Sequence, residues 1–504
     1  MRKIYLKKFI YICISVALFG MFIGISALNE GKQCLGIPII REHELNGYEE
    51  TTDFDISHIQ FSGETIAVNF PSSTVYITQP VESVKNFKTL AGKLEASDLT
   101  FELAILKTEA MDNLSETVKS SLPLTLIIKS GNMYQRVNLI ITTLPILYLD
   151  FDSAREDEQG RNINTGKITL WNNASSTYKV GTTVSNAEWR LRGNSTRTFD
   201  KKAWKLNLRD EDFQKSNVDL LGLGSDDDYI LNPMSMDDTF VKEKLVQELW
   251  SQLMKQADYN YQMTKGEYVE LFINGAYQGL YLLQRRIDAK YLNLNRNQDI
   301  LLKGINTWEA ETYQDGYEIV SSPYDSEKTY ELLANAMNFE ENSMIHSKNF
   351  IDVSVLLQFI SGTDNYGYKN TFYVLKKEME KYVLYFVPWD TDLSFGVTWG
   401  YNYEESMNEI IERYEFPIVR EHVADIDKQI ANRWYELRDR IYSKENVLSI
   451  YEQLIEQLDI SGALNRDTEK WGLLHEGEDN RENLEKFIGE RLILLDKYYE
   501  NVLN

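Results

Sequence analysis

Four polar side chains of the segment 363–396 stand at the ends of two predicted strands. Asp364 and Asn370 lie around a turn before the first strand, and Asp390 and Asp392 directly follow the second. Residues i and i+2 at an extended strand end point to one side, so Asp390 and Asp392 can converge on one divalent cation. The charged turn between the strands returns both pairs to the same end of the sheet. The spacing therefore predicts a metal-binding site there.

This arrangement is what phosphoryl transfer requires. One aspartate orients a hydroxyl nucleophile and accepts its proton, while an asparagine and a second aspartate hold Mg²⁺ against the phosphates. Asp364, Asn370 and the run DLSFG at 392–396 follow that order along the chain. Paired acids at a strand end are also common as solvated turn or capping residues, and this interpretation stays open at this point.

A basic, glycine-containing turn at 190–205 offers groups that could bind a phosphate. Arg192 and Ser195 lie in the turn, and Lys202 and Lys205 lead into the next predicted strand. Arginine and lysine donors bind anionic phosphates together with a flexible backbone. The alternative is an ordinary charged hairpin loop, although the turn stands out in so acidic a chain.

Missing motifs exclude several other chemistries. The five histidines form no HExxH or other ligand pair, which argues against a zinc hydrolase. No G-x-S-x-G elbow, Walker loop or G-x-G-x-x-G fingerprint is present. The formal net charge of -24 argues against nucleic acid and against adhesion to anionic lipid. A divalent cation or a basic protein partner suits such a surface better.

The first residues predict a membrane anchor. Four arginine or lysine residues within 1–8 precede an uncharged run at 9–28, and a bilayer crossing needs about 20 residues. The positive-inside rule makes 1–8 a cytoplasmic tail and places everything after 28 outside the cell. A cleaved signal peptide, which would make the protein secreted, is the alternative.

Beyond this segment the sequence predicts an α+β protein in two parts. After a linker at 29–50, short β-branched and aromatic runs at 51–145 predict a small antiparallel β domain, sandwich-like, that serves as a spacer. Residues 146–504 mix helical and strand patterns and are interpreted as one domain. Within it, Asn274-Gly275 is a strong hairpin signal, and the chain from about 410 onward is helical.

Four blocks of the second part, in this order and spacing, resemble the CotH family of spore-coat kinase-like proteins. They are RLRGNSTRTFDKKAWKLNL, LLGLGSDDDYILNPMSMDDTFVKEKLVQEL, LFINGAYQGLYLLQRRID and YFVPWDTDLSFG. The resemblance covers about 146–504. It implies an atypical protein-kinase-like fold that acts on secreted or coat proteins with ATP and Mg²⁺, or Mn²⁺.

The resemblance also implies roles for the four polar residues of the predicted strand ends. Asp364 becomes the catalytic aspartate and Asp390 the metal ligand, with Asn370 and Asp392 assisting.

On the nucleotide side, the resemblance makes Lys202 the phosphate-contacting lysine, with Lys205 as the alternative. Arg192 and Ser195 would line the mouth of the nucleotide site. Two further acids match recurrent family positions, namely Asp228 and Asp238, and a helix N-cap role explains Asp238 equally well.

One departure from the family pattern concerns the end of the predicted hairpin. A glutamate is expected after GLYLL in the pattern Y-L-L-x-E, where this chain has Arg285. If that acid pairs the nucleotide lysine or contacts the base, its loss weakens nucleotide binding.

Three functions are therefore considered. The first is an ATP- and Mg²⁺-dependent kinase for Ser or Thr of a cell-surface or spore-coat protein. The second is a scaffold of weak or no activity that organises such proteins, which Arg285 favours. The third treats Asp390 and Asp392 as the D-x-D of a sugar-nucleotide transferase, but the predicted N-terminal half is not Rossmann-like.

Overall fold

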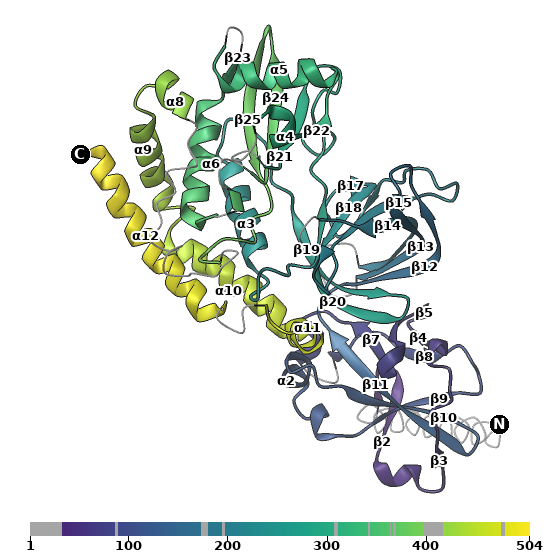
Figure 1. Cartoon of the computed structure of the whole chain (residues 1–504). Coiled ribbons are helices and arrows are strands. Elements are labelled where there is room, and N and C mark those ends of the chain that lie inside the picture. The colour runs from purple at the N-terminus through teal and green to yellow at the C-terminus, as the bar shows by residue number, and fades with distance from the viewer. Residues whose placement is uncertain are drawn as a thin grey trace, which may run out of the picture.

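The computed structural model of the chain is mixed α+β and consists of a β-rich N-terminal region, a β-barrel and a part that combines a sheet with helices (Figure 1). The structure describes residues 33–85, 89–172, 180–193, 197–306, 311–340, 343–362, 364–365, 369–397, 417–474 and 479–504. The predicted membrane span at 9–28 lies outside these ranges. Among the helices that are described, none is both long enough and apolar enough to cross a bilayer.

The N-terminal region is built on an eight-stranded sheet with its own apolar core. The sheet runs β1 (Gln33–Cys34), β2 (Ile37–Ile40), β9 (Glu102–Leu106), β10 (Leu124–Ser130), β11 (Met133–Thr142), β7 (Thr74–Thr78) and β6 (Ala67–Asn69), and β3 (Glu49–Glu50) pairs with β11. A smaller sheet comprises β5 (Glu64–Thr65), β4 (Ile59–Phe61) and β8 (Leu94–Ala96). Short helical segments connect them: η1 (Glu42–Leu45), η2 (Ile56–His58), η3 (Phe70–Ser72), η4 (Ser83–Lys85), η6 (Glu109–Met111) and α2 (Leu114–Lys119).

Two features of this region differ from the sequence-based expectation. The sheet is mixed rather than antiparallel, because β2 pairs parallel to β9, and β7 pairs parallel to β11. Alternating apolar residues predict a strand but not its direction, so the pattern could not reveal this. Residues 33–50, expected to belong to a linker, contain β1, β2 and β3 of the sheet. Their apolar residues are buried in it, as Ile37 and Ile40 show.

The middle of the chain forms a closed seven-stranded barrel. Its strands, in order around the barrel, are β12 (Ile146–Glu156), β13 (Asn162–Asn172), β14 (Gly181–Leu191), β15 (Trp204–Arg209), β18 (Asp228–Asn232), β20 (Ala276–Arg285) and β19 (Gly266–Ile273). The short strands β16 (Val218–Asp219) and β17 (Ser225–Asp226) pair beside it. The interior is filled by large side chains such as Trp189, Tyr229 and Tyr281. The predicted hairpin is confirmed, since Asn274 and Gly275 join β19 to β20 with positive φ angles.

The third part combines a five-stranded sheet with helices. The sheet order is β22 (Tyr317–Ser321), β21 (Ile300–Gly304), β24 (Thr371–Glu378), β25 (Lys381–Pro388) and β23 (Ser343–Ile345). The helices are α3 (Lys242–Met254), α4 (Tyr313–Gly316), α5 (Ser326–Met337), α6 (Ser347–Ile360), α8 (Pro417–His422), α9 (Ile426–Arg438), α10 (Lys444–Ser461), α11 (Ala463–Trp471) and α12 (Arg481–Leu503). The central helix α6 is buried along most of its length, and one apolar core joins α3, the sheet and the C-terminal helices.

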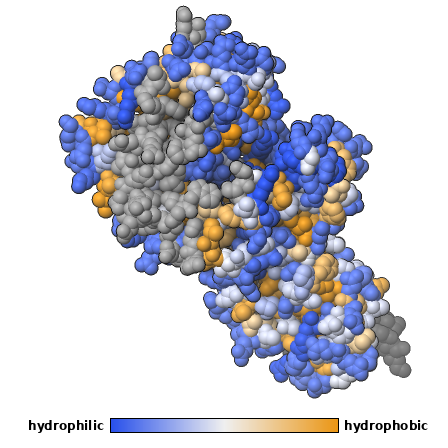
Figure 2. Space-filling model, viewed as in Figure 1, coloured by the Kyte–Doolittle hydropathy of each residue, from blue (hydrophilic) through white to orange (hydrophobic). Residues whose placement is uncertain are grey.

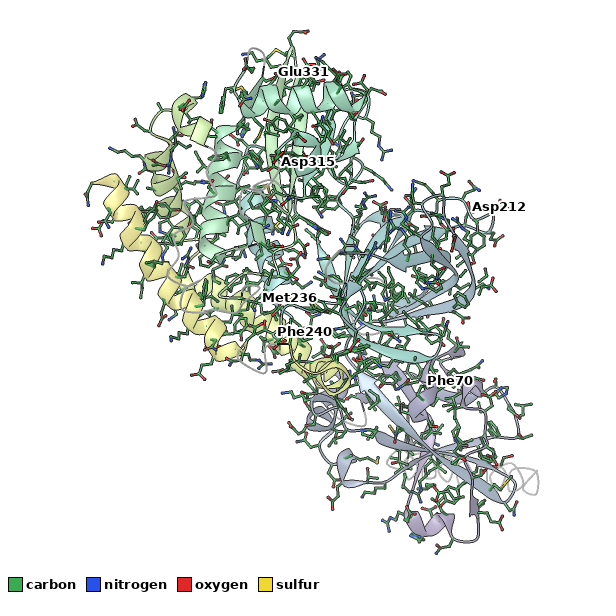
Figure 3. All side chains as sticks on the ribbon, in the orientation of Figure 1. Phe70, Asp212, Met236, Phe240, Asp315 and Glu331 are labelled. Atoms are coloured by element: carbon green, nitrogen blue, oxygen red, sulfur yellow. The ribbon has the colours of Figure 1, made fainter. Side chains whose placement is uncertain are left out.

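The N-terminal region packs directly against the barrel. A shared apolar cluster contains Tyr76 and Ile140 of the β region and Phe272 and Tyr277 of the barrel. Phe70 lies at this junction (Figure 3), where its backbone N–H donates to the carbonyl of Gly275 over 2.9 Å. Helix α11, from the C-terminal part of the chain, lies beside the same junction and packs against β20 (Figure 1). On the face seen in Figure 2, hydrophilic residues dominate the described surface, with apolar residues in small groups.

Candidate active site

The turn before β24 holds Asp364 in a fixed position. Asn370 has a left-handed backbone (φ +51°), its N–H donates to the carbonyl of Gly304 on β21, and its own carbonyl accepts from Trp389 at the end of β25. The Asn370 amide donates to Asp364 Oδ2 over 2.7 Å, and Lys369 Nζ donates to Asp364 Oδ1 over 2.6 Å. Both carboxylate oxygens of Asp364 are therefore oriented by neighbours in the same turn.

A second asparagine ties the ends of the two strands together. Asn365 is fully buried, and its side-chain amide donates to the carbonyls of Asn370 over 3.3 Å and Trp389 over 3.0 Å. These bonds hold the turn before β24 against the residue that precedes Asp390. The sequence offered no signal for this role, because Asn365 reads as one more polar residue of a turn.

Asp390 and Asp392 follow β25 in a constrained turn. Asp390 adopts a left-handed conformation (φ +59°), which is uncommon for a residue with a side chain. Burial raises the pKa of Asp392 well above its ordinary value, and the carboxylates of Asp390, Glu243 and Asp364 raise it further. The pKa of Asp392 thus depends on all three of these carboxylates, and the shared metal site stays a prediction.

Helix α3 adds a carboxylate that the sequence analysis did not identify. Glu243 lies in the first turn of α3 and is buried, and its Oε2 accepts from the backbone N–H (2.8 Å) and the hydroxyl (3.0 Å) of Thr391. Burial raises the pKa of Glu243, and the charge of Asp390 contributes in the same direction. The first turn of a helix is an ordinary place for glutamate, so only the tertiary structure reveals this contact.

The charge of Asp390 acts on two cations. Burial lowers the pKa of Arg192, at the end of β14, and the Asp390 carboxylate opposes that shift. Burial likewise lowers the pKa of Lys303, on β21, again opposed first by Asp390. The Arg192 guanidinium also lies 5.9 Å from the ring centroid of Trp389. Lys303 was not predicted, because the strand ILLKG carries no motif.

A further group of charges extends from the barrel strands. Asp228 Oδ2 lies 3.0 Å from Lys205 Nζ and 3.2 Å from the Arg286 guanidinium. Asp228 raises the pKa of Arg192 and Arg286 lowers it, so both groups of charges act on Arg192. We call Arg192, Lys205, Arg286 and Lys303 the cationic side of the site, and Asp364, Asp390, Asp392 and Glu243 its acidic side.

The structure places the remaining predicted residues as follows. Lys202 Nζ donates to the carbonyls of Arg197 (2.8 Å) and Phe199 (2.5 Å), so its ammonium is used within its own loop. Lys205, the alternative lysine, belongs to the cationic side, where its ammonium pairs with Asp228. Ser195 lies outside the described residues.

Asp238 is not the N-cap of α3. The N-cap position is Val241, and the neighbouring Asp237 accepts from the backbone N–H of Lys242 over 2.8 Å. Asp238 Oδ1 instead accepts from the N–H of Leu474 over 2.9 Å. The helix begins three residues later than a cap at Asp238 requires, because Phe240 adopts a left-handed backbone (φ +59°) before it.

Arg285, at the position where the family pattern expects glutamate, has its own partners. Arg285 forms an ion pair with Asp226, and its guanidinium lies 4.9 Å from the ring centroid of Tyr291. The preceding residue, Gln284, points to the other face of β20 and lies 3.4 Å from Glu243 Oε1. The carboxylate near this end of the strand is thus supplied by α3.

The donor set bears on whether the site could hold a metal ion. Among the residues whose positions are described, no three His, Cys, Asp or Glu side chains lie together as a metal site would require. The repelling carboxylates of Asp390 and Asp392 would be stabilised by a divalent cation, which prefers oxygen ligands. A complete ligand set would also need other oxygens, such as the Asn370 amide or a phosphate.

The comparison with known families gives the class of protein that carries this fold and site. Residues 189–495, more than half of the chain, match the family described as CotH kinase protein. The chain therefore belongs to the CotH kinase protein family. No curated protein matches the chain.

Proposed function

We propose that the chain is an ATP- and Mg²⁺-dependent protein kinase that phosphorylates Ser or Thr of a cell-surface or spore-coat protein. The observation that carries the proposal is that acidic and cationic residues gather around the end of β25. The Arg192 guanidinium lies 5.9 Å from the ring centroid of Trp389, which precedes Asp390, and the Asp390 carboxylate raises the pKa of both Arg192 and Lys303 against the effect of burial. Phosphoryl transfer depends mainly on positioning and on electrostatic stabilisation, which such an arrangement supplies.

The chain's own residues would divide the work as follows. Asp364, held by Lys369 and Asn370, orients the substrate hydroxyl and accepts its proton at a carboxylate oxygen. Lys303 and Arg192 stabilise negative charge on the phosphates. When bound, Mg²⁺ neutralises phosphate charge, and Asp390, Asp392 and Asn370 would hold it.

The proposed setting is the outer side of a membrane. The basic residues and the apolar run at 1–28 support a single N-terminal anchor with the rest of the chain outside, or a secreted protein if the segment is cleaved. The excess of acidic residues suits a basic protein partner and disfavours nucleic acid.

The test is transfer of labelled γ-phosphate by the full chain in detergent, with Mg²⁺ or Mn²⁺ and a basic Ser/Thr-rich protein. We expect transfer that requires the metal and falls at least about 100-fold in Asp364→Asn, because the proton acceptor is lost. Asp299→Asn, in a carboxylate that instead bonds the backbone N–H of Lys377, is the matched control.

A second candidate is a scaffold of weak or no activity, favoured by Arg285 at the expected glutamate position and its use in an ion pair with Asp226. It predicts no transfer and no rise in melting temperature with Mg·ATP. That pair of results would replace the kinase proposal.

A further inference from the structure

The three residues that follow the end of β25 differ in their exposure. Asp390 and Asp392 are partly exposed, whereas Thr391 between them is fully buried. The two carboxylates therefore reach the surface, while the threonine side chain is enclosed by the protein. We call residues 390–392 the acid loop.

The enclosed threonine is held by Glu243 of α3. Glu243 Oε2 accepts from the backbone N–H of Thr391 over 2.8 Å and from its hydroxyl over 3.0 Å. On the other side, the Thr391 carbonyl accepts from the Ser394 hydroxyl over 2.6 Å. The N–H, the hydroxyl and the carbonyl of Thr391 are thus all bound, and Asp390 and Asp392 are its direct neighbours in the chain. Their positions depend on this anchor.

The second oxygen of Glu243 connects the acid loop to two further elements. Oε1 accepts from the amide of Gln247, one helical turn further along α3, over 3.2 Å, and from the amide of Gln284 over 3.4 Å. Gln284 lies on β20 of the barrel, and both glutamines are buried. Glu243 is therefore a point at which α3, the barrel and the acid loop meet.

Glu243 itself lies behind the acid loop. Its side chain belongs to a residue that is only 2% exposed, and both of its carboxylate oxygens already accept hydrogen bonds within the protein. To contact a metal ion or a substrate directly, it would have to give up these bonds. The contacts suit a residue that orients others better than one that reacts or binds a ligand.

We propose that Glu243 is a positioning residue of the candidate active site, which fixes the acid loop through Thr391 so that Asp390 and Asp392 can hold one divalent cation. This inference rests on the proposed function. Groups that orient metal ligands from behind typically contribute 10- to 100-fold to metal affinity, because the ligands are then held in place before the metal binds.

The experiment is calorimetric titration of the full chain in detergent with ATP in the presence of Mn²⁺. Glu243→Met keeps the length of the side chain but removes both acceptor oxygens, and it should weaken binding about 10- to 100-fold. Thr391→Val removes only the hydroxyl and should weaken binding about ten-fold, the effect of one lost hydrogen bond. Glu243→Gln keeps an oxygen that can accept from Thr391, so it should bind within about three-fold of the native chain.

Two controls separate positioning from a general loss of stability. Glu248→Met, at an exposed position of the same helix, should leave the affinity unchanged. Gly279→Ala, which places a Cβ atom against Asp467 far along the chain from the acid loop, should lower the melting temperature without changing the affinity. Thermal unfolding of each variant measures stability. If Glu243→Met does not fold, Thr391→Val and Glu243→Gln still decide the question.

Three results would overturn the inference. Binding by Glu243→Gln that is as weak as that of Glu243→Met would show that the carboxylate acts through its charge or as a metal ligand. Native affinity in Thr391→Val would show that the acid loop is not held through this contact. Absence of Mn²⁺-dependent ATP binding by the native chain would overturn the proposed function and this inference with it, whereas the first two results leave the proposed function standing.

Discussion

Lys303 is the residue whose role depends most on the three-dimensional arrangement. It lies on β21, and the charges of Asp390 and Arg192 shift its pKa in opposite directions. A lysine held at this place supplies fixed positive charge where negative charge gathers on a transferred phosphate.

Replacing Lys303 with alanine should therefore impair transfer without unfolding the protein. We expect kcat/KM for ATP to fall about 10- to 100-fold, the usual cost of removing one positioned charge. Steady-state kinetics with Mg·ATP measure the effect. Lys376→Ala, on the exposed part of β24, is the matched control, and an equal loss in both variants would contradict the assignment.

The residues of the acidic side could be predicted only in part. Asp364 and Asn370 precede β24, and Asp390 and Asp392 follow the neighbouring β25, so their spacing alone implies that they share one end of a sheet. Glu243 and the cationic Lys303 come from α3 and β21, and each sits in an ordinary local pattern. Short stretches of sequence do not show which distant elements will contact each other, so Glu243 and Lys303 could not be assigned to the site from the sequence.

At the scale of elements, α11 can lie against β20 only because residue 279 is glycine. Gly279 has φ +106°, and a Cβ atom there would lie 2.3 Å from Asp467 Oδ2 and 3.0 Å from Trp471 Nε1. Asp467 in turn pairs with the buried Lys201 and accepts from the N–H of Leu280.

Gly279→Ala should accordingly destabilise the protein by about 2–4 kcal/mol, from backbone strain together with the clash against α11. Urea unfolding measures the loss. Gly181→Ala has a comparable φ of +140° but nothing within 4 Å of the added Cβ, so it should cost only the strain, about 1 kcal/mol. Equal costs at the two positions would show that the close approach of α11 is unimportant.

The start of α6 makes stability depend on pH. His346 is the N-cap, and its Nδ1 accepts from the N–H of Asn349 over 3.2 Å, which requires a neutral ring. Burial lowers the pKa of His346, and Lys348 contributes, against the opposing charges of Asp258, Glu378 and Asp352. Below about pH 6.5 the unfolded chain therefore binds a proton that the folded chain does not.

Stability due to His346 should thus decrease as the pH falls from about 6.5 to the lower pKa of the folded state. At pH 7.5 we expect His346→Ala to cost about 1 kcal/mol, whereas His346→Asn keeps a good cap. At pH 5 the native chain should be less stable, relative to the Asn variant, than it is at pH 7.5. Urea unfolding at both pH values checks this, and a pH-independent difference between the native and Asn chains would refute it.

Elements differed in how well the sequence predicted them. The Asn274-Gly275 hairpin could be predicted, because the turn requires two positive φ angles that these residues tolerate. The parallel pairings of β2 and β7 could not, because strand direction is set by the path of the chain between strands. The start of α3 also lies later in the chain than a cap at Asp238 would place it. Phe240 has a left-handed backbone just before the helix, and phenylalanine does not favour this conformation locally.

At the scale of the whole molecule, one buried ion pair connects all three parts. Glu270 of the barrel binds Arg466 of α11, and Arg466 also donates to Ser121 of the β region. Together with the shared apolar cluster, this contact makes the β region an integral part of the structure rather than a loosely attached segment.

Glu270→Ala should leave the Arg466 charge buried without its partner and cost about 3–5 kcal/mol. Urea unfolding, followed both by tyrosine and tryptophan fluorescence and by circular dichroism, should show a single transition at a lower midpoint. Glu102→Ala, exposed on β9, should change stability by less than about 0.5 kcal/mol. Two separate transitions, only one of them shifted, would contradict the rigid docking of the β region.

The central claim is that the acidic and cationic sides form one site for a metal-bound nucleotide. Calorimetric titration of the full chain with ATP, with and without Mg²⁺, tests it most directly when repeated with Asp390→Asn and Arg192→Ala. The account predicts binding that requires Mg²⁺ and weakens at least about ten-fold in each variant, since each removes one side of the site. Binding that is equally tight in both variants, or the same without Mg²⁺, would contradict it.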